Sequence, residues 1–311
     1  MNHIAKRLFT VTNGLFIIFL LIQLIPDKAY RIADHPRYTL IFMAFLEVLL
    51  LAVSFVPKKD QTRQVLTDIA GVIYGFFIFW ILATVKLSLV SEAKQAVFPP
   101  PGAVLDKFAA DSGKMLVNVK DSLLLIFQGY MIAVVTAIPL GLFLGWNMRV
   151  GAVAGYISKF LSSISPIVYI PYAIVLLPTF RSASMFVIIV ASFWPAFAGT
   201  MSGVHNVEKR LIDSAKMLCV SKFTMLFRII LPAALPQIFI GCNQGLGVSF
   251  ILLVSAEMIG ARSGLGFYVN NYANFGNYTN ALVGVIAIGI VVSCITFLFN
   301  AAQRFLLRWK Q

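Results

Sequence analysis

A charged stretch from Asn206 to Pro236 separates two strongly apolar runs and is the best candidate for contact with a soluble partner. Four apolar residues in its first half recur at helical spacing, namely Val207, Leu211, Ala215 and Leu218. Charged residues fall on the other sides of the same helix, as on an amphipathic surface helix. These side chains form no catalytic set, but a helix of about 12 residues is roughly 18 Å long and can lie across a shallow groove. The stretch therefore predicts a docking helix.

Polar residues are expected to set the ends of this docking helix by bonding to free backbone N–H groups. Asn206 is the expected N-cap, with Glu208 in the first turn, and Ser221 is expected to cap a second short helix. Pro232 and Pro236 then open the next apolar run. Two short amphipathic helices are therefore expected between two membrane spans.

Five polar side chains within or beside apolar runs are candidates for a solute path. Glu47 lies in the middle of a run, where an acid is either functional or a carboxyl hydrogen-bonded to a neighbouring helix. Asn243 and Gln244 can line a path or hold two helices together, because amides in hydrocarbon need partners or water. Glu257 and Arg262 follow at the end of the same run and form either an outer gate or an ordinary interfacial ion pair.

Two of the apolar runs carry glycine pairs spaced for close helix packing. One run contains Gly141 and Gly145, and the other contains Gly241 and Gly245. Small residues four positions apart let helix backbones approach closely in lipid. Each pair therefore predicts a helix contact.

Several kinds of chemistry find no support in the sequence. It has no Gly-x-x-x-x-Gly-Lys-Ser/Thr motif for ATP phosphates, and its three histidines and three cysteines show no metal-ligand spacing. No serine, histidine and aspartate set is recognisable either. We therefore expect no enzyme activity, metal or cofactor. If ATP drives transport, its hydrolysis belongs to another polypeptide.

The charged stretch resembles the cytoplasmic loop of binding-protein-dependent ABC importer permeases. That loop reads Glu-Ala-Ala, three residues, Gly, nine residues, Ile, one residue and Leu-Pro. The residues at these positions here are Asp213-Ser214-Ala215, Cys219, Ile229 and Leu231-Pro232. Every spacing fits, whereas Asp, Ser and Cys replace Glu, the first Ala and Gly. The stretches at 98–105 and 256–266 also resemble segments typical of the nitrate/sulfonate/taurine branch.

The resemblance implies a permease subunit of an ATP-driven importer for a small solute, such as a nitrate-, sulfonate- or taurine-like anion. It also implies two copies of the permease, two ATP-binding subunits and a separate solute-binding protein. Contact with the ATP-binding subunit then falls to Asp213, Ser214, Ala215, Lys216 and Cys219, followed by Leu231 and Pro232 at the junction with the next span. Pro232 is expected to set the angle between loop and span.

The cysteine at position 219 has a physical consequence for the loop. A glycine after a helix commonly takes the left-handed conformation that ends the helix. Cys219 must either adopt that conformation with some strain or end the turn differently.

The composition places the chain in a membrane. Of its 311 residues, 59% are hydrophobic and 12% are charged, against about 25% charged in a soluble protein. The net charge of +13 fits cytoplasmic loops facing anionic lipid, and no nucleic-acid-binding module accompanies it. We therefore expect an all-α, polytopic protein of the bacterial cytoplasmic membrane.

About eight apolar runs are long enough to span a bilayer. They are 8–26, 39–56, 69–90, 119–146, 164–180, 183–203, 231–256 and 281–301. A modest excess of basic residues in alternate loops, with an even number of spans, predicts that both termini are cytoplasmic. Residues 91–118 are then outside, as a docking surface for a binding protein or as a connector.

Two domains are expected, and one alternative function stays open. Residues 1–64 form an additional transmembrane hairpin, and residues 65–311 form the permease domain with its coupling loop at 204–230. The alternative is an ion-coupled secondary transporter with Glu47 and Glu257 as ion or proton sites. Such folds often show internal repeats, which are not visible here, and the loop motif has no role in them.

Overall fold

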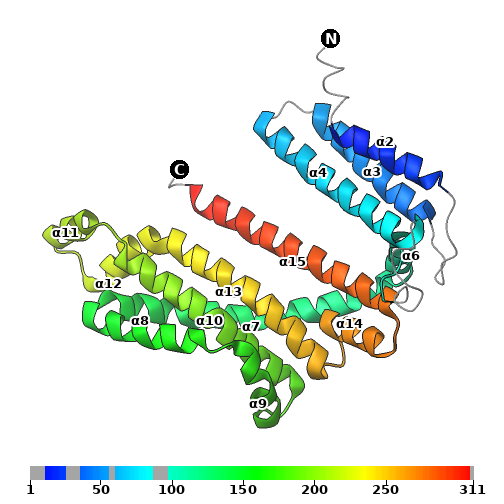
Figure 1. Cartoon of the computed structure of the whole chain (residues 1–311). Helices are drawn as coiled ribbons and strands as arrows, with labels where there is room; N and C mark the ends of the chain where they lie inside the picture. Colours follow the sequence, from blue (N-terminus) through cyan, green and yellow to red (C-terminus); the bar gives the residue numbers. More distant parts are fainter. Residues whose placement is uncertain (1–10, 26–35, 56–59, 87–96, 309–311) are drawn as a thin grey trace. The chain divides into compact units, whose positions relative to one another are not determined.

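The computed structural model describes residues 11–25, 36–55, 60–86 and 97–308, and these residues form helices and turns without strands (Figure 1). The chain divides into two compact units. The first comprises residues 1–113 and 271–283, and the second comprises residues 114–270 and 284–311. The all-α prediction is confirmed for the described residues.

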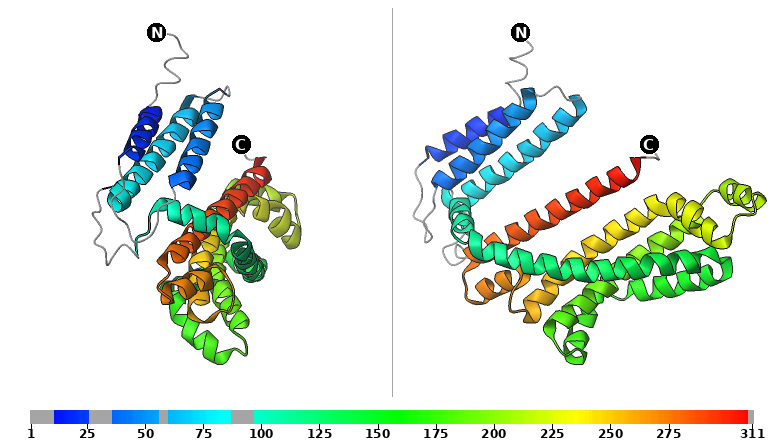
Figure 2. Two further views of the ribbon diagram at one scale, coloured as in Figure 1. Left: turned by 90° about the vertical axis from the view of Figure 1, so that its right-hand side faces the viewer. Right: turned by 180° about the vertical axis from the view of Figure 1, so that it is seen from behind.

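Three helices and one short helix make up most of the first unit. They are α2 (Val11–Gln23), α3 (Pro36–Phe55), α4 (Asp60–Ile81) with a π-helical turn at Leu82–Lys86, and α6 (Pro101–Ala110). Helices α2, α3 and α4 lie side by side (Figure 2). Their shared core contains Phe19, Met43 and Tyr74, all fully buried.

Glu47 lies in this core and is bound to a neighbouring helix. The Tyr74 hydroxyl on α4 donates a hydrogen bond to Oε2 of Glu47 on α3, at 2.6 Å. A buried carboxyl with a hydrogen-bond donor stabilises helix packing in a place where an unpartnered acid would be costly. The hydrogen bond to a neighbouring helix that the packing alternative for Glu47 predicts is present.

The proline-rich segment ahead of α6 packs into the same unit. Residues 99–104 are buried, and the Trp80 indole N–H on α4 donates to the Pro99 carbonyl at 3.0 Å. Pro101 occupies the first turn of α6, where its missing N–H costs nothing. The first half of α6 is thus a packed connector, while Lys107, Ala109 and Ala110 are exposed.

The expected domain boundary at residue 64 falls inside α4. Helix α4 contacts both α2 and α3, so the residues before and after position 64 share one packed unit. The division into an added hairpin and a permease domain therefore stays a prediction.

The second unit contains the longer helices of the chain (Figure 1). They are α7 (Ser112–Trp146), α8 (Met148–Ser163), α9 (Tyr169–Leu176) after a 3₁₀ turn at Pro166–Val168, α10 (Phe180–His205), α11 (Lys209–Met217), α12 (Lys222–Thr224), a π-helical turn at Met225–Ile230, α13 (Leu231–Gly260), α14 (Leu265–Asn274) and α15 (Tyr278–Leu306). Residues 271–283, at the α14–α15 junction, belong to the first unit.

The number of spans differs from the eight that the sequence predicts. The described residues contain five helices long and apolar enough to cross a membrane, or six if one bent pair counts as a single span. That pair joins 149–163 to 166–176 at an angle of 67°, so the run expected as a span at 164–180 forms the second part of a bent pair rather than a span of its own. The bend follows from Pro166, because a proline forces the residue before it out of the helical conformation.

Helices α10 and α13 form the most extensive helix contact of the second unit. A Cβ added at Gly199 would lie 2.7 Å from the Cα of Gly241, and one added at Gly245 would lie 2.9 Å from the Ser192 carbonyl oxygen. Hydroxyls of Ser192 and Ser249 also bond to each other across this contact. The close approach predicted for Gly241 and Gly245 is confirmed.

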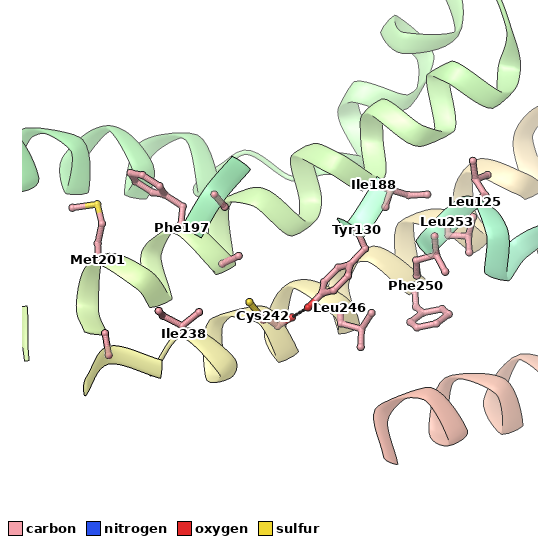
Figure 3. Packing of buried hydrophobic residues seen from close by; sticks show 14 residues of the cluster. Leu125, Tyr130, Ile188, Phe197, Met201, Ile238, Cys242, Leu246, Phe250 and Leu253 are labelled. Atoms are coloured by element: carbon pink, nitrogen blue, oxygen red, sulfur yellow. Dashed lines mark hydrogen bonds between the residues drawn. The ribbon is translucent and has the colours of Figure 1, made fainter. Parts of the chain in front are cut away.

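Helix α7 packs on the other side of α10 through its own glycines. Gly141 faces Thr200, and Gly145 faces Val204. The buried core shown in Figure 3 lies among α7, α10 and α13, where the Tyr130 hydroxyl donates to the Cys242 carbonyl at 2.9 Å. Because their backbones are held this close, α7, α10 and α13 form a rigid support for the loop that follows α10 and for the turn that follows α13.

Candidate coupling loop and outer polar cluster

The predicted docking helix is α11, which stands between α10 and α12 (Figure 1). It begins at Lys209 with Glu208 as N-cap, whose side chain makes no capping bond. The expected N-cap, Asn206, is instead the C-cap of α10, because the apolar helix continues to His205. Ser221 caps α12 through its hydroxyl and the Thr224 N–H, as predicted.

Only one side of α11 is packed against the rest of the unit. Ala215 is buried and Ile212 is half-buried, in a cluster with Met225 and Leu226 of the following π-helical turn. The remaining apolar residues of the helix and its end are uncovered, with exposures of 47% for Leu211, 87% for Met217 and 78% for Leu218. The predicted apolar face is therefore divided between the packed side and the solvent side.

The polar residues of the loop motif point away from the packed side. Asp213 and Ser214 are exposed, and Lys216 Nζ lies 3.6 Å from Asp213 Oδ1 one turn along the helix. Both charged side chains are more than half exposed, so this pair contributes little to stability. Their charges stay accessible to another protein.

Cys219 ends α11 in the left-handed conformation, with φ of 51°. The Val220 N–H bonds to the Ala215 carbonyl and the Cys219 N–H bonds to the Lys216 carbonyl, at 3.3 and 3.0 Å. This pair of bonds is the Schellman motif, which usually has glycine at this position. Of the two outcomes predicted for Cys219, the strained conformation is the one found.

Replacing Cys219 by glycine is expected to tighten the end of α11. Relief of the left-handed strain, about 1 kcal/mol, outweighs the extra chain entropy of glycine by about half a kcal/mol. Hydrogen–deuterium exchange of the amides at 217–220 should therefore slow by about twofold. Cys219→Ala keeps the strain and should leave exchange unchanged. Equal slowing in both variants would assign the effect to the thiol instead.

The junction of the loop with α13 is continuous helix. Residues 222–260 form one helical stretch, and Pro232 lies directly after the π-helical turn at 225–230. Proline has no N–H to donate, and a local π-helical turn accommodates such a change in the bonding ladder. Pro232 and the half-buried Leu231 thus connect loop and span without a corner, and the expected setting of an angle by Pro232 stays a prediction.

The opposite end of α13 carries a buried cluster around Glu257. The Glu257 side chain is 3% exposed, and its carboxylate accepts bonds from the Ser122 hydroxyl at 2.6 Å and the Gly266 N–H at 2.8 Å. The Leu265 N–H donates to the Ser122 oxygen, and the Gly264 N–H donates to Asn118 Oδ1, both at 2.9 Å. Side chains from α7 and α13 thus bind three successive N–H groups at the start of α14. We call this set of residues, Asn118, Ser122, Glu257 and 264–266, the α14 clamp.

Glycine is required at two positions of the α14 clamp. Gly264 has φ of 118°, which side-chain-bearing residues rarely adopt. A Cβ at Gly264 or Gly266 would also overlap atoms of Glu257. The Gly-Leu-Gly sequence at 264–266 therefore lets the backbone approach the carboxylate closely.

Glu257 does not pair with Arg262, because its two oxygens bond to Ser122 and Gly266. The expected ion pair between them is therefore wrong for the described chain. Both residues do line one cavity of about 310 Å³, together with Asp121 and Arg181. Arg262 is exposed at this cavity in the turn between α13 and α14.

Asn243 and Gln244 lie in the middle of α13. Gly241 and Gly245 take the contact with α10, whereas Asn243 is half-buried and Gln244 is exposed. An amide at this depth requires a polar partner, a water-filled path or another subunit. Both roles considered for these amides, lining a path and holding helices together, stay predictions.

The sequence matches the family profile described as "Binding-protein-dependent transport system inner membrane component" over residues 137–310. This range covers more than half of the chain and includes the loop, α13 and the α14 clamp residues at 257–266. The chain belongs to this permease family.

Curated relatives of the permease come from several bacteria. It is 30% identical to the taurine transport system permease protein TauC of Escherichia coli, over 80% of this chain and 91% of TauC. It is 29% identical to the bicarbonate transport system permease protein CmpB of Synechococcus elongatus, over 80% of this chain and 92% of CmpB. These relatives confirm the predicted branch of ABC importer permeases.

The fold is also that of a solved transporter. A chain of the MetNI methionine ABC transporter, in an inward-facing conformation, superposes with a TM-score of 0.55 at 19% identity. The match covers 63% of this permease and 97% of that chain. The family profile and the relatives, rather than this fold likeness, identify the permease as a multi-pass inner-membrane protein of an ABC importer, and they replace the ion-coupled secondary transporter as the function.

Several residues of the α14 clamp and of the contact between α10 and α13 were not predicted. Asn118 and Ser122 are four residues apart at the start of α7, a spacing that places both on one helix face. Gly199 and Gly203 on α10 have the same four-residue spacing as the glycine pairs on α7 and α13. The four-residue spacing in each pair is visible in the sequence. The residues that they contact lie on distant segments, and the spacing does not identify them.

Proposed function

We propose that this permease forms the membrane path for a small anion and is driven by a separate ATP-binding subunit that docks on α11. The observation that carries the proposal is the uncovered side of α11. Three apolar side chains, Leu211, Met217 and Leu218, are exposed next to the accessible charges of Asp213 and Lys216. Exposed apolar groups rimmed by charge mark a protein contact site.

A continuous run of helix connects this surface to the opposite end of α13. Ala215 packs on Met225 and Leu226, and from there one continuous helix runs to Gly260. The 30 residues of α13 alone span about 45 Å. Its glycine contact with α10 makes the two helices move together, so displacement of α11 would reorient both helices along the path. This supports alternating access driven from the α11 end.

The rest of the assembly follows from the same proposal. Two copies of the permease enclose the path, with Asn243 and Gln244 on its wall, and lipid covers the outward apolar faces. The α11 end and both termini are cytoplasmic, and a solute-binding protein delivers the solute at the opposite end. The solute carries an acidic group, because relatives are named for taurine and bicarbonate. The N-terminal hairpin at 1–64 is an addition to the permease domain.

Charge reversal at Asp213 tests the docking of the ATP-binding subunit. Asp213→Arg adds a fourth positive side chain to α11, which already carries Lys209, Arg210 and Lys216, and removes the acidic side chain of this helix. We expect co-purification of the ATP-binding subunit encoded with the permease, and the ATPase activity of the complex in lipid, to fall about tenfold. The permease itself should stay folded, because Asp213 is exposed.

The matched control is Glu208→Arg, which makes the same change of charge at the N-cap of α11. It should retain most of the assembly, because position 208 precedes the motif. Equal loss in both variants would reduce the effect to net charge and remove Asp213 from the contact. Normal assembly of Asp213→Arg, or uptake that needs no ATP, would contradict the proposed coupling.

A further inference from the structure

The cavity next to the α14 clamp has a charged lining that neither the loop motif nor the family match explains. It lies at the end of α13 opposite α11 and is lined by α7, α10 and the turn between α13 and α14. Its polar lining comprises Asp121, Arg181, Glu257, Arg262 and Ser263. At about 310 Å³ it has the size of a small-molecule pocket at the lower limit of the usual range.

Two arginines supply the positive charge of this cavity. The Arg181 guanidinium donates a hydrogen bond to the Gln128 amide oxygen on α7, at 3.1 Å. Arg262 is exposed in the turn after α13. Within the described residues, neither guanidinium forms an ion pair with a carboxylate. Both therefore retain N–H groups for an incoming acceptor.

The acidic residues of the lining are less accessible than the arginines. Glu257 is buried, and each of its oxygens already accepts a bond inside the α14 clamp. Asp121 is half-buried and is the other acid among the lining residues. Of the two acids in the lining only Asp121 is not already bonded inside the α14 clamp, whereas both guanidinium groups keep N–H donors, so the accessible donors favour an anionic acceptor.

Both arginines are carried on firmly held backbone. Arg181 lies in the first turn of α10, where Thr179 and Ser182 form reciprocal capping bonds of 3.2 and 3.3 Å. Arg262 precedes Gly264 by two residues, and the α14 clamp fixes that backbone through the Gly264 N–H. Guanidinium groups on preorganised backbone lose less entropy when they bind a planar or tetrahedral acid group.

We propose that Arg181 and Arg262 form a receiving site for the acidic group of the transported solute, which is a carboxylate, a sulfonate or a small inorganic oxyanion. This inference rests on the proposed function and specifies where the solute first contacts the permease. Guanidinium groups bind such oxyanions through paired N–H donors, and they raise the local concentration of anions at the mouth of a path.

The test uses the complete transporter in proteoliposomes, with its ATP-binding subunit and binding protein. Radiolabelled taurine, bicarbonate and nitrate serve as probes, and the anion that the wild type imports is used for all variants. Arg181→Gln/Arg262→Gln should lower ATP-dependent uptake at saturating binding protein by about tenfold or more. Arg181→Lys/Arg262→Lys should retain more uptake than the glutamine pair. Arg149→Gln, an exposed arginine at the start of α8, is the control and should import normally.

Three outcomes would overturn the receiving site. Uptake by the double glutamine variant within about twofold of the wild type would show that the arginines are not needed. An equal loss of affinity for the loaded binding protein, measured with the transporter in lipid, would show that they dock that protein rather than the solute. Failure of the wild type to import any probe would remove the anion assignment, while the role of the α11 loop is judged separately from the Asp213 experiment.

Discussion

Gly241→Ala is expected to lower the free energy of unfolding of the permease by about 3 kcal/mol. The added methyl group would lie 2.5 Å from the Pro195 carbonyl oxygen and 2.9 Å from the Cα of Gly199. Both neighbours are backbone atoms, which cannot rotate away as a side-chain end can. Helices α10 and α13 would have to separate, with loss of the packing shown in Figure 3.

The matched control lies six residues further along the same helix. Nothing approaches within 4 Å of a Cβ added at Gly247, so Gly247→Ala should raise the unfolding free energy by up to about 1 kcal/mol through its helix propensity. Unfolding titrations in mixed micelles measure both changes. Opposite signs would confirm the glycine contact, whereas equal effects at positions 241 and 247 would contradict it.

The glycine contact was partly predictable because helix packing in lipid leaves a local pattern in the sequence. Gly241 and Gly245 are four residues apart on α13, and this spacing alone places them on one face. The pattern does not name the partner helix. The partner glycines, Gly199 and Gly203, are on α10. Which helix packs against α13 depends on the tertiary arrangement, and the spacing of glycines along the sequence does not specify it.

The loop was predictable for a different reason. The spacing from Asp213 to Pro232 reflects a local chain geometry, a short helix closed by a left-handed residue and followed by a span. Asn206 misled the prediction of the helix start, because a good N-cap residue also suits the C-terminal end of a preceding helix. The pairing of 149–163 with 166–176 across a bend was not predicted, because an apolar run shows hydropathy but not the direction of the helix.

The α14 clamp was the least predictable feature, since its bonds join residues far apart in the chain. Ser122 and Glu257 are separated by 135 positions, and Asn118 and Gly264 by 146. The sequence marked Glu257 as an acid at the end of an apolar run, and it suggested Arg262 as the nearest opposite charge. Backbone N–H groups are present in every loop, so sequence patterns cannot reveal that they, rather than Arg262, satisfy this carboxylate.

Glu257→Ala is expected to lower the free energy of unfolding by about 4 kcal/mol, because two buried donors lose their acceptor and a cavity remains. The donors are the Ser122 hydroxyl and the Gly266 N–H. Glu257→Gln should cost about 2 kcal/mol, since the amide keeps one oxygen but turns N–H groups toward the second donor. Ser255→Ala is the control on the same helix, because among the described residues its hydroxyl bonds to the Ile251 carbonyl of its own helix and to no other helix.

The two variants at Glu257 also separate a structural role from a role in the path. If the carboxylate acts only through the α14 clamp, Ser122→Ala should weaken stability in the same direction, and the double variant with Glu257→Ala should show a coupling of about 1 kcal/mol or more. Uptake per folded transporter should then stay close to that of the wild type in Glu257→Gln. An unchanged stability of Glu257→Gln combined with lost uptake would contradict the clamp and place the carboxylate in the path of the solute. The reason to expect the first result is geometric, because both carboxylate oxygens already accept bonds from the chain itself.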